Sequence, residues 1–324
     1  GIPDAGTIVI LDHTNVSGSY TVNLDTDADG LAQSIIINSG GNQISLVLNG
    51  RTLTVTEDIT VSSNSVLTQT NTVDEITLGG SWSNEGTFNE GTSTVIFNPI
   101  TGTHTINTQG VGDAFNNLTI NGSGGTNVVS SELDVNGDVM LLSGVLNAGT
   151  NTIHIAGDWT RNGGAIFEVG TSLVDFDNSG NQNINGGEFY NLTSSGSGTK
   201  TITANIDIDN DITIGAGTVI DGGSNIIYIG DDWTNNAGNP GFTQNGAGTV
   251  IFDGGASGQD ISLNQQTAFN NITITGTQTK YTRNNITVNG NLVINGAALY
   301  IVDGTTVNGA GASNTVNMTS GRIY

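Results

Sequence analysis

Apolar and polar residues alternate in short bursts along the whole chain, as in "NTIHIAGDW" (151–159), "NIIYIGDDW" (225–233) and "TVIF" (94–97 and 249–252). Short runs with this period of two, rich in Ile, Val and Thr, predict half-buried β-strands. Asn-Gly, Gly-Gly and Ser-Gly steps separate the bursts and suit tight turns. Because no segment carries a convincing apolar stripe with the helical period, the pattern predicts an all-β protein.

Several phrases recur along the chain, which predicts an internal repeat of roughly 75 residues. The only three tryptophans are Trp82, Trp159 and Trp233. "TVIF" returns as "LVDF" (173–176), and "LDVNGDVMLLSG" (133–144) returns as "IDIDNDITIGAG" (206–217) and "ITVNGNLVINGA" (286–297). "FNNLTI" (115–120) returns as "FYNLTS" (189–194) and "FNNITI" (269–274), so Phe115, Phe189 and Phe269 are equivalent. The chain therefore holds about four copies of one unit.

Short strands that return in register favour a parallel β-helix, or β-solenoid, in which each coil stacks on the one before. We expect an N-terminal strand or cap region at 1–33 and a single solenoid at 34–324. The repeat landmarks divide the solenoid near 34–82, 83–159, 160–233 and 234–324. The tryptophans are expected to fill one packing position of this core several times. The alternative is a row of exposed rings that stack on sugars.

Composition excludes some functions and favours others. The formal net charge is -23, with six basic residues, and such a field repels nucleic acid. There is no cysteine, which excludes disulfides and thiolate metal sites, and no apolar run long enough for a membrane-spanning helix. An acidic chain rich in Asn, Thr and Gly is typical of a secreted protein. Its opening, "GIPDAGTIVILD", suits a mature form or an excised fragment.

The segment "DTDADG" (25–30) is the clearest candidate metal site. Asp25, Asp27 and Asp29 match the first half of a calcium loop, and Gly30 suits its turn. Position 12 of the loop is Ile36, where a bidentate Glu is expected. The hypotheses are therefore a weak calcium site, completed by a ligand from elsewhere, or a solvated acidic turn.

A second acidic stretch, "IDIDNDI" (206–212), is expected to place Asp207, Asp209 and Asp211 on the outer face of one strand. The inward positions would then be taken by Ile206, Ile208 and Ile212. A calcium bridge to a neighbouring coil is the alternative. The sequence also offers possible N-glycosylation sequons, including those at Asn117, Asn191 and Asn271.

No catalytic residues are predicted. The architecture resembles that of polysaccharide lyases, but the few basic residues are scattered. The pair Asp231–Asp232 resembles that of pectin hydrolases, yet their His-Gly and Arg-Ile-Lys segments are missing. The histidines His13, His104 and His154 show neither zinc spacing nor a nucleophile elbow. We therefore expect that the protein is not an enzyme. We also expect that it requires no cofactor, and calcium is the one ion that the sequence suggests.

The recurring phrases "GDWT", "TVIFDG" and "FNNLTI" resemble repeats of very large secreted surface proteins of bacteria and archaea. The resemblance covers nearly the whole chain and implies adhesins, surface-layer components or extracellular fibres. No functional residue of those proteins can be assigned to a position in this sequence.

No amphipathic capping helix is predicted at either end of the solenoid, and open coils expose unpaired backbone groups. We therefore expect copies of the chain to stack head to tail into an extracellular filament or surface layer. The alternative is an adhesin or glycan-binding module at the cell surface. Less favoured are ice binding, hinted at by "TLTVT" (52–56), and a polysaccharide-degrading enzyme.

Overall fold

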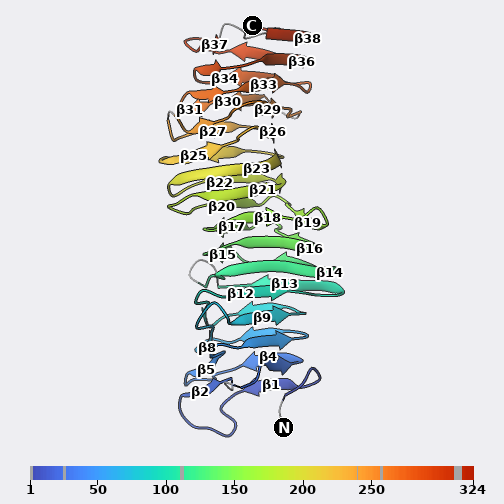
Figure 1. Ribbon diagram of the computed structural model, residues 1–324, viewed down its shortest axis with the longest axis vertical. Coiled ribbons are helices and arrows are strands. Elements are labelled where there is room, and N and C mark those ends of the chain that lie inside the picture. Colours follow the sequence, from blue (N-terminus) through green and yellow to red (C-terminus); the bar gives the residue numbers. More distant parts are fainter. Residues whose placement is uncertain (1–2, 25–26, 110–112, 239, 256–257, 310–315) are drawn as a thin grey trace. The chain divides into compact units, whose positions relative to one another are not determined.

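The computed structural model describes residues 3–24, 27–109, 113–238, 240–255, 258–309 and 316–324, and only the backbone of 316, 317, 319 and 320. These residues form 38 strands and no helix. They fold as a parallel β-solenoid of about 14 turns, which confirms the predicted fold class (Figure 1). No helix among the described residues could cross a membrane.

The chain divides into two compact units, Gly1–Ile155 with Arg161–Gly170, and Ala156–Thr160 with Thr171–Tyr324. The first holds β1 (Ile8–Leu11), β2 (Tyr20–Asn23), β3 (Gly30–Ala32), β4 (Ser34–Ile37), β5 (Ile44–Val47), β6 (Thr52–Val55), β7 (Ile59–Val61), β8 (Ser65–Thr68), β9 (Glu75–Leu78), β10 (Trp82–Asn84), β11 (Thr87–Asn89), β12 (Thr94–Phe97), β13 (Gly102–Asn107), β14 (Asn117–Val129), β15 (Leu133–Val135), β16 (Val139–Asn147), β17 (Thr152–Ile155) and β19 (Ala165–Glu168). β18 (Trp159–Arg161) has residues in both units.

The second unit holds the remaining strands. They are β20 (Leu173–Phe176), β21 (Gln182–Phe189), β22 (Asn191–Ser194), β23 (Gly198–Ile208), β24 (Ile212–Ile214), β25 (Thr218–Asp221), β26 (Ile226–Ile229), β27 (Trp233–Asn235), β28 (Phe242–Thr243), β29 (Thr249–Phe252), β30 (Gln259–Ile261), β31 (Leu263–Asn264), β32 (Thr267–Phe269), β33 (Asn271–Ile274), β34 (Thr279–Thr282), β35 (Ile286–Val288), β36 (Leu292–Ile301), β37 (Val307–Gly309) and β38 (Val316–Ile323).

Strands pair in parallel with the strand one turn further on, so inward side chains stack in columns. In the first unit β6, β9, β12 and β14 align Leu53, Ile76, Val95 and Leu118, each at most 2% exposed. Alternate residues of the same strands face outward. The period of two seen in the sequence therefore separates the apolar core from the surface.

The recurring phrases stack directly on one another. Val95 of "TVIF" pairs with Leu118 of "FNNLTI", and in the second unit Val250 pairs with Ile272 in the equivalent phrases. Each repeat therefore spans several successive turns, which explains a repeat length near 75 residues.

The segment 1–33, expected as a strand or cap region, supplies β1, β2 and β3. These strands pair in parallel with β4, β5 and β6. They form the first turn of the first unit. The expected domain boundaries stay a prediction.

Candidate functional site: acidic turns and buried lysines

The three tryptophans lie in the core, fully buried. Trp82 packs edge-on against Phe115, with ring centroids 5.2 Å apart, and Trp233 packs against Phe269 in the same way at 5.1 Å. Trp159 lies 5.5 Å from Phe189. Burial leaves these rings no surface on which a sugar could stack, so their contacts are packing contacts.

The acidic turns of the second unit form a hydrogen-bonded column. The Asn191 side-chain oxygen accepts the backbone N–H of Asp211 at 3.2 Å. Asp211 Oδ1 accepts the N–H of Asp232 at 2.9 Å, and Asp232 Oδ1 accepts the N–H of Asp260 at 2.8 Å. Each side chain thus caps the backbone of the next turn, where the strand pairing is interrupted.

In the first unit, side-chain oxygens accept backbone N–H groups of the next turn in the same way. Asp58 Oδ1 accepts the N–H of Ser81 at 2.7 Å, and Ser81 Oγ accepts the N–H of Thr105 at 3.1 Å. Small polar side chains at these turns therefore have a structural task, whether or not they also bind a ligand.

Asp211, Asp231 and Asp232 bring carboxylate oxygens within 4.8 Å of one another. The turn depends on Gly230, since a Cβ there would lie 2.0 Å from the carbonyl oxygen of Asp209. Burial, followed by repulsion from neighbouring carboxylates, raises the pKa of Asp231. Burial also raises the pKa of Asp232, although the N–H of Asp260 opposes this. Half-buried carboxylates in this arrangement match the oxygen ligands that Ca²⁺ prefers.

The expectation that Asp207, Asp209 and Asp211 share one strand face is wrong. β23 ends at Ile208 and β24 begins at Ile212, so Asp209 and Asp211 lie in the intervening turn. The period of two fails here because the chain bends around a corner. Burial is the main cause of the raised pKa of both Asp207 and Asp209.

Two fully buried lysines were not predicted. The ammonium of Lys200 donates to the carbonyl oxygens of Asn178 at 2.8 Å, Ser197 at 3.0 Å and Gly180 at 3.3 Å. Lys280 Nζ donates to the carbonyl oxygen of Gly254. Burial lowers the pKa of both lysines, and nearby aspartates oppose that shift.

The two lysines occupy one repeat position. Each follows the asparagine of the "FNNLTI"-type phrase by the same number of residues, and that spacing is the signal that could have found them. Lys200 stacks on buried Gln182, and Lys280 on buried Gln259. In the first unit the buried polar residue that follows the equivalent phrase is Asn127, one residue further along than the lysines.

The "DTDADG" segment lies partly outside the described residues, which exclude Asp25. Asp27 and Asp29 are exposed, and Asp29 Oδ1 accepts the N–H of Thr52 at 3.1 Å. Ile36 lies within β4, so position 12 of the loop presents hydrocarbon. The calcium site remains a prediction, and Asp29 already has the capping role seen at other turns.

The sequon asparagines belong to the same capping system. The side-chain oxygens of Asn117 and Asn271 accept the N–H groups of Asp138 and Asn291, both at 2.9 Å, as Asn191 does for Asp211. The repeat therefore explains these asparagines structurally, and their glycosylation remains a prediction.

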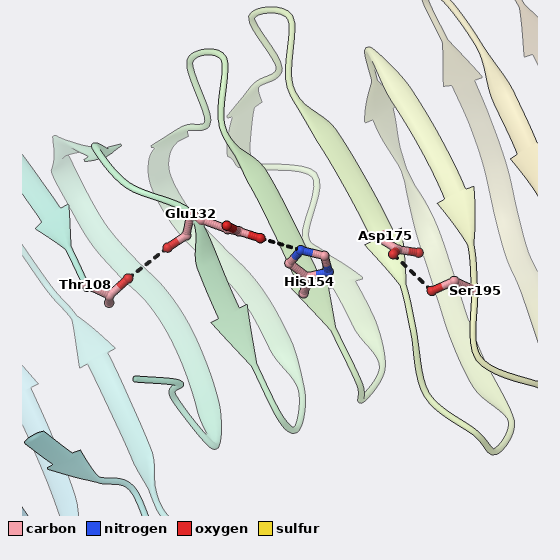
Figure 2. Close-up of polar contacts among 5 residues, drawn as sticks. All are labelled: Thr108, Glu132, His154, Asp175 and Ser195. Atoms are coloured by element: carbon pink, nitrogen blue, oxygen red, sulfur yellow. Dashed lines mark hydrogen bonds and ion pairs between the residues drawn. The ribbon is translucent and has the colours of Figure 1, made fainter. Parts of the chain in front are cut away.

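The histidines contact structural groups. His154 Nε2 lies 2.8 Å from Glu132 Oε1 on the outer face, and Thr108 Oγ1 donates to the Glu132 carbonyl oxygen (Figure 2). Figure 2 also shows the separate hydrogen bond from Ser195 to Asp175. His104 bonds the carbonyl of Thr101.

Both ring nitrogens of His13 lie against carbonyl oxygens, of Asn42 at 2.8 Å and Val16 at 2.9 Å. Only the imidazolium form can donate to both, so these contacts raise the pKa of His13. The expectation that the protein is not an enzyme remains a prediction.

Three comparisons were made, with models of protein families, with curated proteins and with solved structures, and none of them yields a match.

Proposed function

We propose that this protein is an extracellular structural protein whose copies associate head to tail into a filament or surface layer. The observation that carries the proposal is an open strand edge on β1 and another on β38 among the described residues. β1 pairs on one edge with β4, and β38 pairs on one edge with β36. Among the described residues their other edges have no partner strand, and such an edge is a template for another chain.

Two further features support a structural role. The tryptophans, the capping aspartates and the buried lysines all hold the solenoid together through contacts inside it. The net charge of -23 keeps copies apart except where a specific contact forms. The likeness of the recurring phrases to those of secreted surface proteins favours an extracellular location. The proposal requires no cofactor and no catalytic group.

Sedimentation velocity of the purified protein tests the proposal. The sedimentation coefficient should rise with protein concentration, because association is a mass-action equilibrium. The experiment is run with calcium and with EDTA, so that dependence on calcium would implicate the acidic turns. One unchanging monomer peak at every concentration, in both buffers, would rule out self-association.

A second candidate function is glycan binding, favoured by a column of tyrosines on the outer surface. Tyr281 and Tyr300 lie 5.7 Å apart between ring centroids, and Tyr300 and Tyr324 lie 6.3 Å apart. Arg283 lies 4.9 Å over the Tyr281 ring and contacts Asp260 at 2.6 Å. Exposed rings beside polar groups can stack on sugar faces.

Titration with soluble oligosaccharides, followed by tyrosine fluorescence and calorimetry, tests this candidate. Binding that Tyr300→Ala abolishes would support a glycan site, with Tyr228→Ala as the matched control elsewhere on the second unit. Identical binding by both variants, or none by the unmodified protein, would exclude it.

A further inference from the structure

We propose that a hollow on the side of the first unit binds one sugar of a neutral polysaccharide. The hollow is named the corner hollow, and it is lined by residues of segments 56–58, 79–81 and 100–104. These segments are the corners of three successive turns, where β6 leads to β7, β9 to β10 and β12 to β13. The inference does not rest on head-to-tail association, and its site is separate from the tyrosine column of the second unit.

The corner hollow has the size of a small-molecule site, with a volume of about 500 Å³. Two glycines form part of its wall. A Cβ at Gly79 would lie 2.3 Å from the carbonyl oxygen of Thr56, and a Cβ at Gly80 would lie 2.4 Å from Asp58 Oδ1. Only glycine lets these corners approach so closely, so backbone forms this part of the wall.

The third corner presents an apolar side chain to the hollow. Ile100 is 78% exposed, which is the highest value for a large apolar side chain in the described part of the chain. Its corner lies tightly against β14, since a Cβ at Gly122 would lie 2.3 Å from Pro99 Cδ and a Cβ at Gly124 would lie 2.0 Å from the Ile100 carbonyl oxygen. A ligand that covers Ile100 would therefore gain hydrophobic free energy on a surface that is already in place.

Polar groups with unused hydrogen-bonding capacity line the same hollow. Asp58 Oδ1 accepts the N–H of Ser81 at 2.7 Å, while Asp58 Oδ2 has no hydrogen-bond partner among the described residues. His104 Nε2 lies 2.8 Å from the carbonyl oxygen of Thr101, so Nε2 carries the hydrogen and Nδ1 of the neutral ring is an acceptor. The exposed hydroxyl of Thr103 can donate and accept.

The charge of the hollow excludes an anionic ligand. Its lining contains the carboxylates of Glu57 and Asp58 and no lysine or arginine, in a chain whose net charge is -23. A phosphate, sulfate or uronate would meet repulsion without a compensating cation. The ligand is therefore neutral or positively charged.

The arrangement of the polar groups favours a sugar over a metal ion. The carboxylate oxygens of Glu57 already accept the Gln33 amide at 3.0 Å and the Ser34 hydroxyl at 3.4 Å. Glu57, Asp58 and His104 do not gather three ligand atoms within 4.8 Å, the spacing found in the acidic turn of the second unit. Polar groups spread around one apolar side chain match a larger ligand that has hydroxyl groups and a C–H face, as a neutral sugar ring does.

The hollow admits one sugar of a longer chain. Ile100, Thr101 and Thr103 are all exposed, so this side of the hollow is open to solvent. Neighbouring sugars can then remain outside while one ring lies against Ile100. The probes for the test are accordingly oligosaccharides.

NMR of the imidazole C–H signals tests the inference, because the chain has only three histidines, His13, His104 and His154. His104→Gln identifies the His104 signal. The unmodified protein is titrated with cellohexaose, maltohexaose and mannohexaose, which are neutral, and with anionic hexagalacturonate. We expect at least one neutral oligosaccharide to shift the His104 signal saturably while the other two histidine signals stay in place. Hexagalacturonate should shift none of the three.

Two variants test whether the lining residues make the contact. Ile100→Ala should weaken binding about tenfold, because the ligand loses its apolar contact. The matched control is Ile166→Ala, since Ile166 is 53% exposed on β19 of the same unit and lies outside the hollow. Thr103→Val keeps the side-chain shape, removes the hydroxyl and should weaken binding roughly fivefold. Thermal melting checks that each variant is folded.

The outcomes separate this inference from the other proposals. The inference is overturned if no neutral oligosaccharide shifts the His104 signal, or if calcium chloride shifts it and the oligosaccharides do not. Unchanged affinity in both Ile100→Ala and Thr103→Val would equally overturn it. Tyr300→Ala should leave the His104 response intact, and its loss in that variant would assign binding to the tyrosine column. A protein that shows the His104 response but stays monomeric would retain the corner hollow and lose the self-association.

Discussion

In the first unit Trp82 packs against Phe88 and Phe115, with ring centroids 4.9 and 5.2 Å apart. In the second unit Trp233 packs against Phe242 and Phe269 at 4.8 and 5.1 Å. The aromatic clusters of the two units are therefore nearly the same in geometry.

The buried polar position differs between the same two units. In the first, Asn127 fills it, and its Oδ1 is buried without a hydrogen-bond partner among the described residues. In the second, Lys200 fills it and binds three carbonyl oxygens. The comparison indicates that the aromatic cluster defines the repeat, while this position accepts any polar group that the nearby turn can satisfy.

The largest effect is expected from removing a cluster tryptophan. Trp82→Ala and Trp233→Ala should each lower the free energy of unfolding by about 3–5 kcal/mol, because each empties a packed site. Chemical denaturation measures the loss. Near-equal losses in the two variants would support the equivalence of the clusters. A loss of stability in only one of the two variants would contradict that equivalence.

A smaller loss is expected at the polar position. Lys200→Met should cost about 1–3 kcal/mol, since the carbonyl oxygens of Asn178, Gly180 and Ser197 lose the ammonium as a donor. Asn127→Met is the matched control and should cost less than about 1 kcal/mol, because it removes one long hydrogen bond, from Asn127 Nδ2 to the Val145 carbonyl oxygen at 3.4 Å, and a buried oxygen without a partner. Denaturation curves of the two variants measure both losses of stability. Equal losses would mean that the hydrogen bonds of the Lys200 ammonium do not stabilise the fold.

The acidic turn predicts a gain in stability. Asp231→Asn should stabilise the second unit by roughly 0.5 kcal/mol at neutral pH, because it removes repulsion at a partly exposed site. The raised pKa of Asp231 means that the folded state binds more protons than the unfolded state. Stability of the unmodified protein should therefore rise as the pH falls from neutral toward the unfolded value of 3.8.

The gain from Asp231→Asn should shrink over the same pH window, since protonation removes the same repulsion. Denaturation at neutral and acid pH measures both trends. A variant less stable than the unmodified protein at neutral pH would show that the carboxylate is needed there.

The smallest effect is expected in the first unit, at His13. Its pKa is raised above 6.5 by the carbonyls of Asn42 and Val16, so its contribution is complete below pH 6.5 and is lost as the pH rises through the folded pKa. Hydrogen exchange of residues 13–43 should therefore be slower under mildly acid than under alkaline conditions, after correction for intrinsic rates. His13→Gln should abolish this dependence, and an unchanged dependence would exclude His13 as its source.

Much of the core could be predicted from the sequence, because the period of two and the recurring phrases identify the inward residues directly. Trp159 and Phe189 are repeat positions in the sequence and contact one another in the structure. Contacts between turns were harder to foresee. Asp211 and Asp232 are distant in the sequence, and only the stacking register brings their turns together.

The buried lysines were missed for a different physical reason. A lysine is normally exposed, and burial of Lys200 depends on three backbone carbonyls from two turns that only the folded chain brings together. The strand break after Ile208 was missed because an alternating pattern can continue across a corner while the backbone turns.

Electron microscopy of the unmodified protein at high concentration tests most directly whether this solenoid is a self-assembling structural protein. The account predicts filaments with a single regular axial repeat, formed by parallel stacking of β38 on the first turn of the next copy. Dispersed single particles at every concentration, with and without calcium, would contradict it.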